Sequence, residues 1–273
     1  MAVGGGGILA LILAIASPLL GVDLTPLSGM FGGGAGDQSQ NQPADDLDEC
    51  QTGADANSNV ACLMKGAAAS LDAYWSGKFA QEGISYRSPA GFVLFSGSTS
   101  TGCGTASSAT GPFYCPNDET IYVDTSFFDE LRNQFGANGG PLAEMYVVAH
   151  EWGHHIQKVL GTMDNLNLQQ TGPTSDSVRL ELQADCYGGS WMKDASTVPD
   201  SSGVAFLQPI TKAQINDALN AASVIGDDRI QEQATGQSNP ETWTHGSSDE
   251  RVKWLTIGFE NGPGACTTFD GNP

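Results

Sequence analysis

Basic side chains are scarce in this chain of 273 residues. Lysine and arginine number 11 against 31 aspartates and glutamates, so the formal net charge is −20. Such a charge repels phosphate backbones and anionic lipid headgroups, which argues against nucleic-acid binding. The acidity is typical of a soluble protein in a salty or extracytoplasmic setting.

Closely spaced CxxC pairs, which structural zinc sites commonly use, are also missing. An even number of cysteines favours disulfides instead. The six are Cys50, Cys62, Cys103, Cys115, Cys186 and Cys266. The local pairs Cys50 with Cys62 and Cys103 with Cys115 would leave Cys186 for Cys266. Six cysteines allow 15 pairings, and the sequence does not choose among them.

Long apolar runs are absent except at the N-terminus, where residues 7–22 are almost uninterruptedly apolar. This length suits the core of a secretory signal and is short for a spanning helix, which needs about 20 residues. No basic residue precedes Lys65, although signals and anchors normally carry one before the apolar run. We expect residues 1–24 to be a signal or membrane anchor and the protein to be extracytoplasmic, either secreted or anchored through this segment if it is not cleaved.

The rest of the chain divides into a tether and one domain. Residues 25–59 are rich in Gly, Gln and Asp, and such a composition cannot bury enough apolar surface to order itself. The predicted domain spans residues 60–273. An amphipathic helix over 60–79 is followed by strand-like segments and then by helical patterns, which predicts an α+β fold with a small sheet before a mostly helical part. The expected strands are 92–95, 112–115 and 121–124, and the later helices are 125–135, 141–160, 175–194, 211–225 and 247–260.

One predicted helix carries the motif His-Glu-x-x-His. Pro141 suits its first turn and Gly161 the position just past its end. His150 and His154 are four residues apart, so both imidazoles face the same side and can share a metal ion. Glu151 lies one residue round the helix, where it can act as general base on a water without binding the metal. The pattern therefore predicts a Zn²⁺ site.

The third metal ligand is expected on the helix over 175–194. Glu181 and Asp185 share one face, so Glu181 can bind zinc while Asp185 accepts a hydrogen bond from the outer nitrogen of a ligating histidine. The small residues Ala184, Gly188 and Gly189 would let this helix approach the first one closely. Three protein ligands leave the fourth position to water, as in catalytic zinc sites, and peptide hydrolysis is the natural reaction.

A hydrogen-bond donor for the oxyanion of the reaction is less well defined. His245, in a short polar turn, is our candidate for this catalytic role, and an ordinary surface histidine is the alternative. Tyrosines are alternative donors, and each also suits a core position. They are Tyr114, Tyr122, Tyr146 and Tyr187. His155 is interpreted as a packing or supporting group rather than a ligand.

Three segments together resemble the bacterial neutral zinc metallopeptidase family called YpfJ-like. They are 146–155 (YVVAHEWGHH), 180–189 (LELQADCYGG) and 111–116 (GPFYCP). The turn at His245, followed by Arg251 and Trp254, is also similar to the family's C-terminal pattern. The resemblance implies a gluzincin-like fold, in which a small sheet lies over the active-site helix and its edge strand holds an extended substrate. It implies the same three zinc ligands, the same base, and a membrane anchor at the N-terminus.

Two functions remain open at this point. The first is an exported or anchored zinc endopeptidase acting on peptide or protein substrates. The second is a zinc-stabilised binding or scaffold module that turns over nothing.

Overall fold

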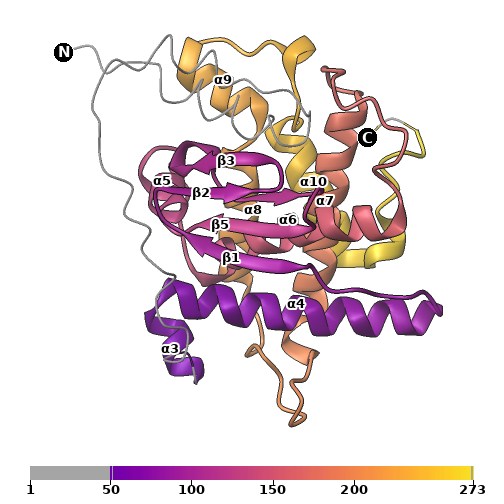
Figure 1. The fold of residues 1–273 in the computed structure, drawn as a ribbon. Coiled ribbons are helices and arrows are strands. Elements are labelled where there is room, and N and C mark those ends of the chain that lie inside the picture. The colour runs from indigo at the N-terminus through magenta and orange to yellow at the C-terminus, as the bar shows by residue number, and fades with distance from the viewer. Residues whose placement is uncertain (1–49, 51, 272) are drawn as a thin grey trace.

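The computed structural model describes residues 50, 52–271 and 273, and these form an α+β fold, as predicted (Figure 1). The helices are α3 (Gly53–Ser58), α4 (Val60–Glu82), α5 (Phe127–Asn133), α6 (Pro141–Leu160), α7 (Asp176–Asp194), α8 (Lys212–Val224), α9 (Asp227–Thr235) and α10 (Ser248–Asn261). The strands are β1 (Gly91–Phe95), β2 (Ser98–Thr101), β3 (Gly104–Ser107), β4 (Phe113–Cys115) and β5 (Thr120–Asp124). All five strands precede helix α5, so the expected order of sheet and helical part is confirmed.

The main sheet is small and mixed. Its strand order is β1-β5-β4, with β5 parallel to β1 and antiparallel to β4. Strand β4 therefore forms one edge of the sheet, and it packs on α6 together with β5. Strands β2 and β3 form a separate antiparallel hairpin, in a region where no strand was expected from the sequence.

Helix α6 has the bounds that its terminal residues predict. Pro141 occupies the first turn, and Gly161 ends the helix in the left-handed region with φ of 74°, a conformation that glycine adopts without steric penalty. The helix packs against α4, α7 and α8. As a result, most of its residues are buried, including both histidines of the motif.

Small residues let α7 approach two neighbours closely. A Cβ on Gly153 of α6 would lie 2.9 Å from the Ala184 backbone of α7. Gly188 faces α6 as expected, whereas Gly189 faces α10, where an added Cβ would lie 2.0 Å from the carbonyl oxygen of Leu255. Both close contacts require glycine, because a Cβ atom would overlap the neighbouring backbone. The backbone of α7 therefore lies in direct contact with the backbones of α6 and α10.

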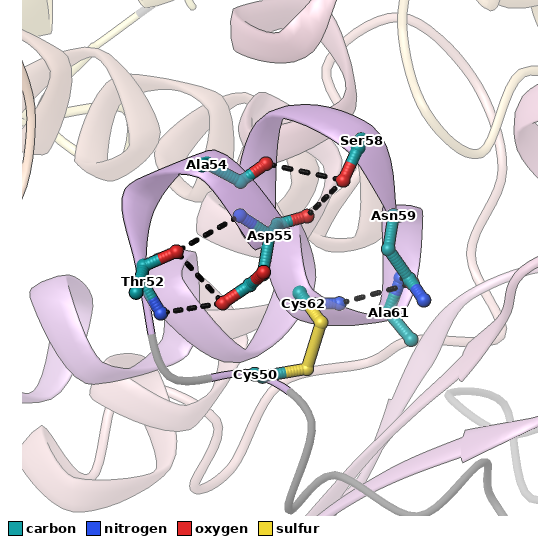
Figure 2. The surroundings of a disulfide bond; sticks show 8 residues. All are labelled: Cys50, Thr52, Ala54, Asp55, Ser58, Asn59, Ala61 and Cys62. Carbon is teal, nitrogen blue, oxygen red and sulfur yellow. Dashed lines mark hydrogen bonds between the residues drawn. A yellow bond between two sulfur atoms is a disulfide. The ribbon is translucent and has the colours of Figure 1, made fainter.

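A helix precedes residue 60 in the described part of the chain. Residues 53–58, which the sequence places in the tether, form α3. The Thr52 side chain caps this helix reciprocally with Asp55, and a disulfide between Cys50 and Cys62 joins it to α4 (Figure 2). No residue of α3 is buried, so a local cap and a covalent link order this segment without an apolar core.

The other cysteines pair as Cys103 with Cys115 and Cys186 with Cys266. Three disulfides are typical of an oxidising, extracytoplasmic compartment. Among the described residues, no helix has the length and apolarity needed to cross a membrane. The predicted signal or anchor at 1–24, and residues 25–49 of the predicted tether, lie outside the described residues.

Candidate metal centre

Three predicted ligands meet between α6 and α7. One ligand atom from each of His150, His154 and Glu181 lies within 4.8 Å of the others. Glu181 Oε2 is 3.0 Å from His150 Nε2, and Glu181 Oε1 is 3.4 Å from His154 Nε2. The three residues are between 2 and 7 % exposed. Two imidazole nitrogens and one carboxylate oxygen converging in a buried site form the ligand set of a catalytic zinc site.

The outer nitrogen of His150 contacts Asp185, the residue expected to support one of the two histidines. The Nδ1–H group donates to Asp185 Oδ1 over 2.8 Å, because a carboxylate can only accept. This bond directs Nε2 of His150 towards Glu181, and it is the usual support of a metal-binding histidine. Asp185 is fully buried.

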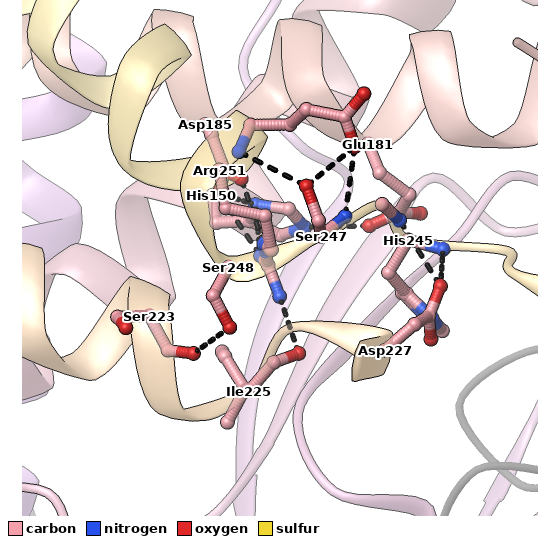
Figure 3. A network of polar contacts seen from close by, with 12 residues as sticks. His150, Glu181, Asp185, Ser223, Ile225, Asp227, His245, Ser247, Ser248 and Arg251 are labelled. Atoms are coloured by element: carbon pink, nitrogen blue, oxygen red, sulfur yellow. Dashed lines mark hydrogen bonds and ion pairs between the residues drawn. The ribbon is translucent and has the colours of Figure 1, made fainter. Parts of the chain in front are cut away.

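Asp185 forms an ion pair with Arg251, a residue that the sequence did not assign to the site. Arg251 of α10 donates to both of its oxygens, over 2.8 Å from Nε and 3.0 Å from Nη2 (Figure 3). Tyr146 donates its hydroxyl to the same carboxylate. Burial alone would raise the pKa of Asp185, but Arg251 and His150 hold it well below its ordinary value. Asp185 is therefore ionised and can orient His150.

The outer nitrogen of His154 has an amide partner. His154 Nδ1 lies 2.8 Å from Gln157 Oε1, one helical turn along α6. The spacing of three residues along a helix could have indicated this contact from the sequence. Both candidate ligand histidines thus have Nδ1 engaged, and Nε2 of each faces the Glu181 carboxylate.

Glu151 lines the same pocket but does not belong to the group of three ligands. Its side chain is buried, and burial raises the pKa of its carboxyl group, although His150 and His154 oppose that shift. A glutamate that lines the pocket beside the candidate ligands, without being one of them, has the position required of a general base.

His245 is brought to the pocket by a loop that Asp227 fixes. Asp227 Oδ2 accepts the backbone N–H groups of Thr244, His245 and Gly246, over 2.7, 2.7 and 3.0 Å. Its other oxygen lies 3.3 Å from His245 Nδ1. Burial lowers the pKa of His245, but Asp227 and Glu181 more than offset this and raise it above its ordinary value. With Nδ1 facing Asp227, Nε2 is the nitrogen that can donate into the pocket. Asp227 is far from residue 245 in the sequence, and no local pattern indicates the pair.

The four tyrosines considered as alternative oxyanion donors bond to other side chains or pack in the core. The hydroxyl of Tyr146 contacts Asp185, that of Tyr114 lies 3.2 Å from His155 Nδ1, and that of Tyr122 donates to Asp118. Tyr187 packs edge-on against Trp75 in the core. His155 is fully buried, and its Nε2 lies 2.9 Å from the carbonyl oxygen of Arg87. This agrees with the interpretation of His155 as a packing group.

These groups line one pocket, which opens to solvent. Its polar lining residues include the three candidate ligands, Glu151, His245 and Arg251. Its apolar walls come from α5, α6, α9 and the loops beside them, and from the edge strand. They include Phe113, Phe127, Phe135, Val147, Ile225 and Ile230. One side of the metal centre is therefore suited to an apolar group.

Two histidines from one helix and a glutamate from a second helix form a candidate metal site with the arrangement of the HExxH metallopeptidase class. The model of the family described as "Putative neutral zinc metallopeptidase" matches residues 1–269. The chain belongs to that family, which confirms the resemblance seen in the sequence.

Relatives are found in mycobacteria and in Escherichia coli. The chain is 52 % identical over 229 residues to the uncharacterised proteins Mb2605 of Mycobacterium bovis and Rv2575 of Mycobacterium tuberculosis, covering 83 % of this chain and 76 % of each relative. It is 38 % identical over 272 residues to the uncharacterised protein YpfJ of Escherichia coli K12, covering 97 % of this chain and 87 % of that protein. No solved structure gives a significant match.

Proposed function

We propose that the protein is a zinc-dependent endopeptidase in which His150, His154 and Glu181 hold the metal ion. The observation that carries the proposal is the convergence of these three donors in one buried pocket, with Nδ1 of both histidines engaged by Asp185 and Gln157. A bound zinc would act as a Lewis acid, polarising the scissile carbonyl and acidifying a water.

Glu151 takes the proton of the attacking water in this mechanism. It is buried, and it lines the pocket together with the three ligands. The same carboxyl group then returns the proton to the departing amine, so one residue serves as base and acid in turn.

His245 donates from Nε2 to the oxyanion that forms on the carbonyl oxygen. Three backbone N–H groups bound to Asp227 hold the loop before the reaction begins. A donor fixed in advance stabilises developing charge without reorganisation at the moment of reaction.

The substrate is a peptide in extended form. Strand β4 is an edge strand packed on α6, and its residues Phe113 and Tyr114 line the pocket together with the preceding Pro112. The residues of β4 are buried, so the inferred pairing is with a peptide that enters the pocket and forms main-chain hydrogen bonds with this edge, while alternate side chains enter pockets. The three disulfides support a site of action outside the cytoplasm.

A peptide-library digest tests this function against that of a silent zinc-stabilised module. We expect cleavage products with the zinc-loaded protein, none after the metal is stripped by a chelator, and products again when zinc is restored. Mass spectrometry of the digest is the measurement. A zinc-loaded, folded protein that yields no chelator-sensitive product would favour the silent module and contradict the proposal.

A further inference from the structure

Helix α7 contacts the C-terminal segment, residues 266–271, along one face. Arg179 donates from Nη1 to the carbonyl oxygen of Thr268 over 2.6 Å, and Gln183 donates from Nε2 to that of Cys266 over 2.9 Å. Cys186 forms its disulfide with Cys266. These α7 residues are spaced by four and then three positions, so they form a single stripe. The C-terminal segment is thus fixed to α7 by hydrogen bonds and a covalent bond.

Gln183 links this stripe to the metal centre. Its Oε1 accepts from Gln157 Nε2 over 3.2 Å, and Gln157 also donates to the carbonyl oxygen of Leu180 over 2.7 Å. The carbonyl groups of Leu180 and Cys266 can only accept, so both side-chain amides have one permitted orientation. Gln157 must then present Oε1 to His154, whose Nδ1 donates and whose Nε2 is left for the metal.

We propose that the C-terminal segment positions the metal ligand His154 through this amide relay, and that Gln157 and Gln183 are positioning residues of the metal centre. The inference rests on the proposed zinc site but not on catalysis. His150 has a carboxylate support in Asp185, whereas His154 depends on two buried amides whose orientation is set by the carbonyl group of Cys266. The disulfide holds that carbonyl in place.

Two substitutions at Gln157 separate orientation from packing. Gln157→Met fills the space but removes the acceptor for His154, and it should weaken zinc binding by about 10–100-fold. Gln157→Glu keeps an acceptor and should bind zinc more tightly than the methionine variant, by about tenfold. The glutamate variant should nevertheless melt at the lower temperature, because its buried carboxylate faces the oxygens of Leu180 and Gln183. Competition with a chromophoric chelator gives the affinities, and Gln81→Met at an exposed position is the control.

The disulfide has a matched control in the same chain. The double variant Cys186→Ala/Cys266→Ala should weaken zinc binding several-fold. Cys50→Ala/Cys62→Ala should leave it unchanged, because α3 and α4 supply no residue to the metal centre. Zinc binding is measured well below the melting temperature of every variant.

The unmodified protein gives an independent reading. With only 4 histidines in the chain, ¹⁵N-histidine NMR of the metal-free protein should show a proton on Nδ1 of His154, because there no metal ion on Nε2 forces that tautomer. The opposite tautomer of His154 would overturn the relay. So would zinc affinities of the Gln157 variants that rank in the same order as their melting temperatures. Equal zinc affinities of the two disulfide variants would also overturn it. If the wild-type protein binds no zinc, the proposed metal centre itself fails. If it binds zinc and the variants match it, only the relay fails.

Discussion

Glu151→Gln is expected to lower kcat by about 10²–10⁴-fold while zinc still binds. Glutamine has nearly the same shape as glutamate, but its amide cannot accept the proton of the attacking water. The residue lines the pocket without belonging to the group of three ligand atoms, so the metal site should survive the change. The measurement pairs single-turnover cleavage of a library-derived peptide with zinc content and affinity.

The same substitution at Glu144 is the control. Glu144 lies in the first turn of α6 and pairs with Arg132, outside the pocket lining. Glu144→Gln should cleave at the wild-type rate. Undiminished cleavage by the Glu151 variant would refute the general-base role, and loss of zinc from it would show that Glu151 supports the metal instead.

His245→Phe is expected to lower kcat by about 10²–10³-fold with little change in KM, which is the effect of removing one oxyanion donor. The aromatic ring fills the buried position, so the loop held by Asp227 should remain folded. Zinc affinity should also remain, because His245 is not among the ligand atoms. Steady-state kinetics on one peptide, with zinc titration beside it, separates these quantities.

Tyr114→Phe tests the alternative donor under the same conditions. The Tyr114 hydroxyl lies 3.2 Å from His155 Nδ1, so its removal should leave kcat near the wild-type value. If Tyr114→Phe lowers kcat more than His245→Phe does, the oxyanion donor is Tyr114 rather than His245.

Features with local physical causes could be predicted from the sequence. Helix α6 has the predicted bounds because Pro141 and Gly161 act on their own backbone. A contact between Asp185 and one of the two histidines could be anticipated, because Asp185 lies four residues after Glu181 on the same helix face. Which histidine it contacts follows only from the packing of α6 against α7.

The hairpin β2–β3 was missed because its residues are mainly Ser, Thr and Gly and show no apolar alternation. Nonlocal contacts hold it instead. The Cys103–Cys115 disulfide ties its turn to β4, and Asp118 accepts the backbone N–H of Gly102 over 2.6 Å. Helix α9 was also missed, since it is short and largely polar.

The site residues that could not be predicted from the sequence also depend on nonlocal contacts. Asp227 and Arg251 act on groups 18 and 66 residues away in the sequence. Those contacts exist only once α7, α9 and α10 have packed together. Gln157 is different, because its position one turn after His154 was available from the sequence.

The most direct test of the metal centre is anomalous diffraction at the zinc absorption edge from crystals of the zinc-loaded protein. We predict a single strong peak in the pocket, with His150 Nε2, His154 Nε2 and a Glu181 carboxylate oxygen at about 2.0–2.2 Å from the ion. A peak elsewhere, or a ligand set without Glu181, would contradict the account.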